Sequence, residues 1–160
     1  MYMHLYKEQM EAGMINSYDN IRLTNVISKK YYFNYKDFEE VMKDFLNGVS
    51  KLGVQIKGFP FYSINKFPEK DENTAMEFFI SVRESTVNVP EDMMFHSYFS
   101  IEDMISMTVF EDYDKSSEKS YEELKKYMKE NKLEQVTPLF AVISGDDTLQ
   151  YISYKVGVIE

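Results

Sequence analysis

A carboxylate in the middle of a predicted strand is the first candidate for chemistry. Glu77 lies between Met76 and Phe78, where a charged side chain has no simple packing role. Such a group can neutralise a cation or, if its pKa is raised, transfer a proton. We take Glu77 as the acid that contacts a ligand; the plainer alternative is a partly solvated strand residue.

The inventory of catalytic residues is small. The chain has no cysteine and only two histidines, His4 and His96, which are 92 residues apart. Thiolate chemistry, disulfides and the common histidine metal motifs are therefore excluded. No phosphate-binding or nucleophile-elbow glycine motif is present. We predict no metal, no cofactor and no catalysis, and an enzyme would have to rely on Glu77.

The charge balance argues against nucleic acid as a partner. Eighteen basic and 27 acidic residues give a net charge of −9, which repels a phosphate backbone. No apolar run approaches the roughly 18 residues that a membrane span needs, and the start of the chain lacks the pattern of a secretory signal. These features predict a cytoplasmic protein that contacts neither nucleic acid nor membrane, and they leave its oligomeric state open.

Two segments have the apolar period of amphipathic helices. Between Asp37 and Leu52 apolar residues recur every three or four positions, with capping-box spacing at Asp37 and Glu40 and a stop at Gly53. A second helix is predicted over 117–131, and its buried side would carry Tyr121, Leu124 and Met128.

Elsewhere the period is two, which indicates strands. Long strands are predicted around 21–33, 75–82, 98–110 and 151–158, and shorter ones at 61–65 and 139–144, each after a proline. The two sets of elements have the same order, and Tyr35 and Tyr113 are 78 residues apart, as are Pro60 and Pro138. We predict a duplication, with residues 17–82 and 95–160 as halves, 83–94 as linker and 1–16 as an extension.

This duplicated strand, helix, strand, strand order resembles the GyrI-like domain. In the second half, Tyr113, the run Tyr121-Glu122-Glu123-Leu124, and Pro138-Leu139-Phe140 are similar to that family's aromatic turn, its helix and its Pro-led strand. Glu111-Asp112 departs from the family's Gly-Pro turn. The resemblance implies an effector-binding module of multidrug-responsive regulators, a module that also occurs as a stand-alone protein.

One departure bears on function. Many members of that family carry a pocket glutamate directly after the Pro-x-aromatic triplet and a tyrosine two residues later, and these positions are Ala141 and Ile143 here. The resemblance therefore gives no reason to expect cationic drug binding, or the hydrolysis that a few relatives perform with that acid.

The expected fold is α+β, a curved antiparallel sheet with two helices on one face and a groove on the other. Strand alternation predicts which residues line the groove. Two of them, Glu77 and Lys155, would be equivalent under the 78-residue repeat. The alternative is that these two side chains form a structural ion pair. The predicted groove residues are Phe61, Ser63, Asn65, Glu77, Phe79 and Ser81 in the first half, and Leu139, Ala141, Ile143, Tyr151, Ser153 and Lys155 in the second. Tyr62 and Phe140 would point toward the helices.

The favoured function is non-catalytic binding of a small amphipathic molecule in that aromatic-lined groove between the halves. The alternative is an acidic interaction module that inhibits or escorts a partner protein. Residues 1–16 offer no room for a helix-turn-helix, so we expect any regulatory output to pass through another protein.

Overall fold

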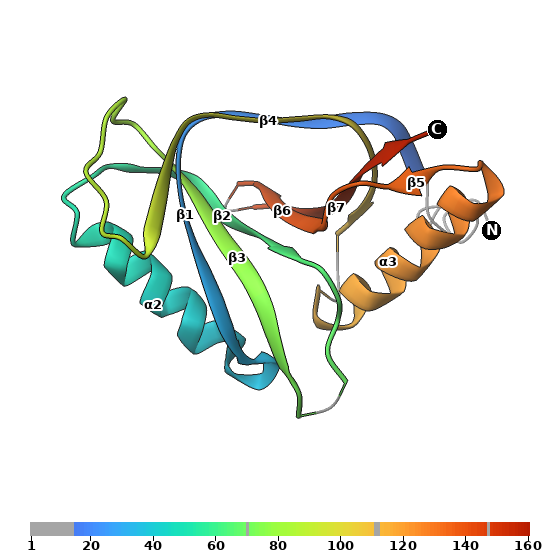
Figure 1. The fold of residues 1–160 in the computed structure, drawn as a ribbon, viewed down its shortest axis with the longest axis horizontal. Coiled ribbons are helices and arrows are strands. Elements are labelled where there is room, and N and C mark those ends of the chain that lie inside the picture. The colour runs from blue at the N-terminus through green and yellow to red at the C-terminus, as the bar shows by residue number, and fades with distance from the viewer. Residues whose placement is uncertain (1–14, 70, 111–112, 147) are drawn as a thin grey trace. The chain divides into compact units, whose positions relative to one another are not determined.

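A computed structural model describes residues 15–69, 71–110, 113–146 and 148–160. The fold is α+β, as predicted, and all the strand pairings given below are antiparallel (Figure 1). The elements are β1 (Ile15–Asn34), the 3-10 turn η1 (Tyr35–Asp37), α2 (Phe38–Ser50), β2 (Ile56–Ile64), β3 (Asn73–Val82), β4 (Met93–Val109), α3 (Tyr113–Glu130), β5 (Glu134–Gln135), β6 (Leu139–Gly145) and β7 (Gln150–Ile159).

The chain forms two compact units. Residues 21–100 make the first, here called the central unit, and 101–160 together with the chain up to Asn20 make the second, the terminal unit. The long strands β1 and β4 each contribute residues to both units, so the units do not coincide with the halves inferred from the repeat.

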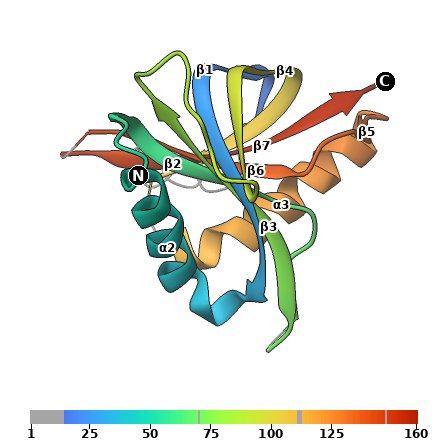
Figure 2. The ribbon, with the colours of Figure 1, turned by 60° about the vertical axis from the view of Figure 1, so that its left-hand side comes forward.

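In the central unit, β3 pairs with β1 on one side and β2 on the other, and α2 lies along one face (Figures 1 and 2). Phe78 on β3 is fully buried and its ring contacts Phe38 and Phe45 from the helix. Tyr62 contacts Phe38 as well, so it points toward the helix as predicted. The buried rings of Phe45, Tyr62 and Phe78, with the half-buried ring of Phe38, give this unit an aromatic core.

The ends of α2 follow the predicted signals only in part. Gly53 has φ +74° and its N–H donates to the Ser50 carbonyl, which ends the helix as expected. Asp37 occupies the N-cap position but its side chain makes no capping hydrogen bond. The capping box was therefore wrong; the preceding turn η1 is capped instead, by Asn34, which accepts from the Lys36 N–H.

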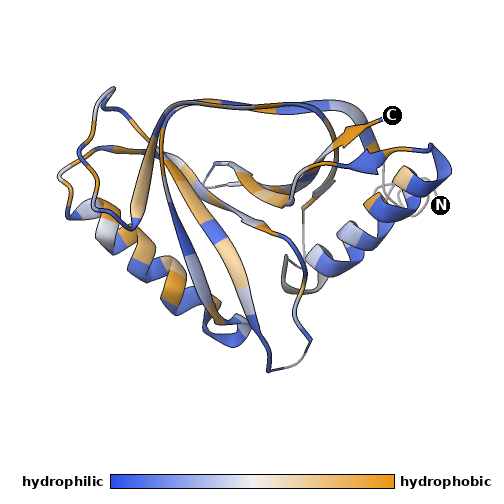
Figure 3. Ribbon diagram, viewed as in Figure 1, coloured by the Kyte–Doolittle hydropathy of each residue, from blue (hydrophilic) through white to orange (hydrophobic). Residues whose placement is uncertain are grey.

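In the terminal unit, β7 pairs with β4, β5 and β6. The predicted buried side of α3 is confirmed, since Tyr121, Leu124 and Met128 are all buried, and most of the rest of the helix is hydrophilic (Figure 3). The Tyr121 hydroxyl donates to Gln135 on β5 at 2.9 Å. Gln135 is opposite Val158, so the two side chains share one face of the β5–β7 pair. Since Tyr121 of α3 bonds to Gln135, α3 lies on this face, which also carries Ile152, Tyr154 and Val156.

Local irregularities repeat as well as the elements. Asn25 in β1 has φ +57°, and Asp103 in β4, 78 residues later, has φ +55°. In β2 the pairing with β3 shifts register between Lys57 and Phe61, and at the corresponding place the chain breaks between β5 and β6. Bulges of this kind are built features of a strand. Their recurrence supports duplication.

Several strands extend beyond the prediction. β1 begins at Ile15, in a polar stretch without alternation, and β2 begins at Ile56, before Pro60. Pro60 lies within the register shift, where the strand needs no N–H at this position for pairing with β3. The predicted turn at Glu111-Asp112 and most of the extension, residues 1–14, lie outside the described residues.

Candidate functional site

An aromatic cluster lies on the face of the central unit opposite α2. Phe61 and Phe79 are stacked, with ring centroids 4.7 Å apart and planes at 6°, and Phe99 on β4 lies 6.0 Å and 5.1 Å from them. Phe61 and Phe79 are buried, whereas Phe99 is half-buried. The cluster therefore offers its Phe99 edge, rather than the stacked pair, to solvent.

A serine–histidine pair adjoins this cluster. Ser28 Oγ and His96 Nε2 share a hydrogen bond of 2.9 Å, and the His96 ring lies edge-on to Phe99. Sequence analysis missed this pair because the residues are 68 positions apart and form no motif. Ser28 is completely buried, so its hydroxyl is a poor nucleophile for an external substrate and serves to hold the imidazole.

The first-half groove residues share one face, as alternation predicts. Phe61 is opposite Phe79, Ser63 is opposite Glu77, and Lys57 is opposite Ser81. Glu77 is half-buried and is also opposite Lys30 of β1. A ligand-binding role for these side chains stays a prediction.

The second-half groove face was partly wrong. Tyr151, Ser153 and Lys155 lie on the face away from α3, as expected, but their partners across the strand are Ser144, Val142 and Phe140. Leu139, Ala141 and Ile143 lie on the other face, with the side chains that face α3, and Phe140 is on the groove side. The prediction assumed a constant offset of 78 residues, and a one-residue slip exchanges the faces of a strand.

The supposed equivalence of Glu77 and Lys155 was wrong for the same reason. Ser28 is opposite Phe79, whereas Ser106, 78 residues later, is opposite Lys155. Lys155 is therefore the counterpart of Phe79, and Ser153 is the counterpart of Glu77.

Lys155 belongs to a partly buried polar network in the terminal unit. Its Nζ donates to Asp19 Oδ1 at 3.2 Å and to the Asn20 carbonyl at 2.9 Å, and the Ser106 hydroxyl donates to Asp19 Oδ2 at 2.6 Å. Burial alone would raise the pKa of Asp19, but the hydrogen bonds from Ser106 and Asn20 and the charge of Lys155 outweigh burial and lower that pKa below 3.8. Asp19 is thus a satisfied anion, and Lys155 is engaged within the protein.

The other predicted groove residues of this unit also have internal partners. Ser153 and Thr108 hydroxyls share a hydrogen bond of 2.9 Å, and the half-buried Tyr151 lies 5.6 Å from the Phe110 ring. The polar side chains of this face are therefore bonded to one another, which does not favour ligand binding there.

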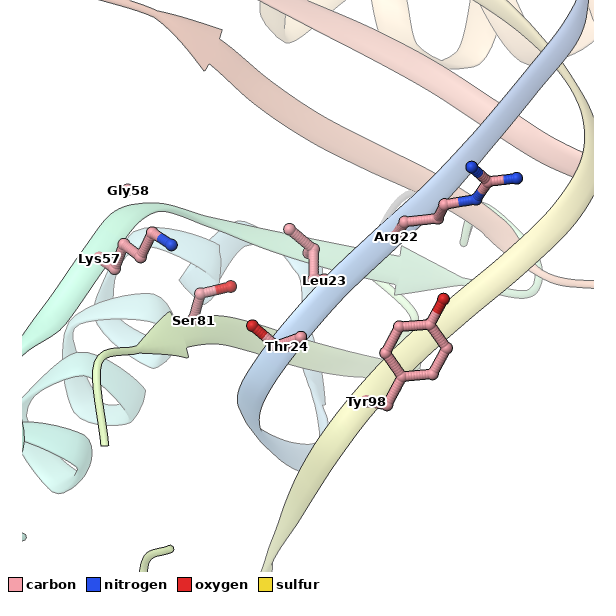
Figure 4. A pocket seen from close by; sticks show the side chains of 7 residues that line it. All are labelled: Arg22, Leu23, Thr24, Lys57, Gly58, Ser81 and Tyr98. Atoms are coloured by element: carbon pink, nitrogen blue, oxygen red, sulfur yellow. The ribbon is translucent and has the colours of Figure 1, made fainter. Parts of the chain in front are cut away.

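A pocket of about 340 Å³ opens in the central unit (Figure 4). Its lining comes from β1, β2, β3 and β4, and consists of Arg22, Leu23, Thr24, Lys57, Gly58, Ser81 and Tyr98. Of the predicted ligand-binding residues, only Ser81 lines it. The remaining lining residues were not predicted, because they are exposed polar positions or isolated apolar positions that belong to no motif.

Two backbone irregularities frame this pocket. Gly58 has φ +78° at the register shift of β2, and Asn25, the residue after Thr24, has φ +57° in β1. A Cβ at Gly58 would meet no atom within 4 Å, so the space above this bulge is open. Bulges near sites redirect neighbouring side chains, which explains why the pocket forms here.

Within the described ranges, no group of three or more His, Asp or Glu side chains is placed to hold a metal ion. Over the same residues, neither helix has the length and apolar character to cross a membrane.

Comparison with known proteins decides the family. A sequence profile described as a domain of unknown function, DUF5085, matches residues 22–160. The chain belongs to the DUF5085 family. No curated protein matches this DUF5085 chain.

Solved structures show the same fold at low identity. The EcmrR chain in a DNA complex is 15% identical with a TM-score of 0.67 over 99% of this chain and 64% of that one, so the DUF5085 chain spans less than two thirds of EcmrR. The EcmrR C-terminal domain alone is 13% identical with a TM-score of 0.66, over 89% and 98% of the two chains.

Two proteins of Listeria innocua are also similar. An uncharacterized conserved protein is 11% identical with a TM-score of 0.56, and a hydrolase is 11% identical with a TM-score of 0.54; each comparison covers 97% of this chain and 98% of the other. The predicted similarity to GyrI-like domains is thereby confirmed for the fold.

Proposed function

We propose that this DUF5085 protein binds a small amphipathic molecule in the pocket of the central unit, without transforming it. The observation that carries the proposal is the pocket itself. Its volume of about 340 Å³ falls at the lower end of the range of ligand sites, about 300–1,000 Å³. The resemblance to effector-binding domains, which the fold shares, supports binding of a small molecule.

The lining suits binding better than catalysis. Leu23 and the ring of Tyr98 provide apolar surface, and hydroxyl groups of Thr24 and Ser81 provide polar contacts. This combination of apolar wall and few polar groups orients a ligand. Neither Glu77, the acid considered for catalysis, nor His96 is among the lining residues.

Titration with the uncharged fluorophore N-phenyl-1-naphthylamine tests the proposal. We expect saturable fluorescence enhancement by the intact chain. Thr24→Trp places a large ring in the pocket from an exposed position and should weaken binding at least tenfold, whereas Thr86→Trp, the same change at another exposed threonine, should not. No enhancement, or equal affinity of both variants, would overturn the proposal.

Native mass spectrometry of protein purified gently from its host gives a second test. A small adduct that disappears on denaturation, and is absent from Thr24→Trp, would support a loaded pocket. A co-purifying polypeptide without any small adduct would instead favour the interaction-module alternative.

A further inference from the structure

We propose that the polar end of the ligand is an anion, so that this pocket selects small amphipathic anions. This inference rests on the proposed function and specifies its ligand class. Lys57 lines the pocket together with Arg22, which also interacts with another group of the protein, and no acidic side chain lines it. Such a lining is notable in a chain whose acidic residues outnumber the basic ones by 27 to 18.

Three of the donors that line the pocket point toward one another, whereas the Arg22 guanidinium points away from them. Figure 4 shows the Lys57 ammonium and the Ser81 and Thr24 hydroxyls directed toward one another, with the Tyr98 hydroxyl toward the side of Arg22. Lys57 and Ser81 are directly opposite in the β2–β3 pairing, which fixes their separation. Ammonium and hydroxyl donors converging on one point match the acceptors of a carboxylate.

Lys57 is available for this task. It is exposed, and within the described part of the chain it forms no ion pair with a carboxylate. Lys155, by contrast, is engaged by Asp19. The open space over Gly58, next to Lys57, leaves room for a ligand group beside the ammonium.

The acid first considered for cation binding is too distant to reverse this preference. Glu77 is four residues before Ser81 on β3, about 13 Å along the strand at roughly 3.3 Å per residue. A cationic head in the pocket would meet the Lys57 ammonium, and none of the lining residues would offer it a carboxylate. Leu23 and the Tyr98 ring, 62% exposed, would cover the apolar body of either ligand.

Displacement of N-phenyl-1-naphthylamine by three ligands of equal chain length tests the charge preference. The ligands are decanoate, decanol and decyltrimethylammonium, used below their micellar concentrations. We expect decanoate to bind at least about tenfold more tightly than the other two, as a charge-assisted hydrogen bond would provide. Added salt should weaken decanoate binding and leave decanol unchanged.

Matched variants assign the preference to the pocket. Lys57→Gln should lower decanoate affinity about fivefold or more with decanol unaffected, since it removes the cation among the converging donors. Lys43→Gln, an equal charge change at an exposed position of α2, should have no effect.

The outcomes separate this inference from the proposed function. Equal binding of all three ligands, tightest binding of the cation, or an unaltered decanoate affinity in Lys57→Gln would overturn the anion inference while the proposed function stands. Failure of every ligand and of the fluorophore to bind would overturn both.

Discussion

The central and terminal units use one backbone plan with opposite chemistry. Each has a strand–helix–strand–strand order and a residue of positive φ at the same place, Asn25 or Asp103. Opposite the helix, however, Phe79 of the central unit stacks on Phe61, whereas its counterpart Lys155 pairs with Asp19. A shared scaffold thus carries an aromatic layer in one unit and an ionic layer in the other.

The two units differ in whether their polar side chains are already bonded within the protein. In the terminal unit the cation, the carboxylate and the hydroxyls of this face bond to one another, so none needs a ligand. In the central unit the stacked rings fill the interior, and the Lys57 ammonium and the hydroxyls of Thr24 and Ser81 line an open pocket. Buried polar groups are normally satisfied internally, whereas exposed donors around a cavity can recognise a ligand.

The largest effect should come from the aromatic layer. Phe79→Ala removes a buried ring from the stack on Phe61 and should lower the free energy of unfolding by about 3–5 kcal/mol. Urea unfolding monitored by circular dichroism measures the change. Phe79→Leu, which keeps most of the volume, should lose much less and remains measurable if the alanine variant does not fold. Equal losses would show that ring volume is not the cause.

A substitution at the equivalent position of the terminal unit, Lys155, should lower the free energy of unfolding by less. Lys155→Met leaves the partly buried Asp19 without its cation, and we expect a loss of about 1–3 kcal/mol in the same assay. Lys125→Met breaks an exposed pair with Glu122 and should change stability by less than about 0.5 kcal/mol. If Lys155→Met costs no more than Lys125→Met, the network contributes nothing.

The same network should make stability depend on acid. Because the folded-state pKa of Asp19 lies below its unfolded value, ionised Asp19 stabilises the fold above that unfolded value, and this stabilisation is lost as the pH falls through the folded pKa. The stability difference between the natural protein and Asp19→Asn should therefore shrink from about pH 6 to about pH 3. A difference that grows on acidification would contradict the lowered pKa.

The smallest expected effects test the shared backbone plan. Asn25→Ala and Asp103→Ala each place alanine at positive φ, where asparagine and aspartate are better tolerated, at a cost of about 1 kcal/mol. Thermal unfolding of the two variants should give similar losses. Glycine at either position relieves the strain and serves as the control. A loss confined to one variant would show that the two positions of positive φ are not equivalent.

Local pattern was sufficient for the elements and the core. Of the apolar positions predicted to share one face between Asp37 and Leu52, Phe45 and Val49 are buried, as are Leu124 and Met128 of α3. Helix periodicity depends on near neighbours in the chain, so one sequence reveals it. The polar first turn of α3 and the start of β1 carry no such pattern, and their bounds were missed.

The sequence by itself determined the helices, the alternation of β3 and the duplicated order. Only the tertiary structure decided the face of β6, because Phe140, rather than Leu139, is opposite Lys155, the counterpart of Phe79. It also brought Arg22, Lys57, Ser81 and Tyr98 around one pocket. Such contacts join residues far apart in the chain through strand pairing, and no local pattern encodes which strands pair or in which register.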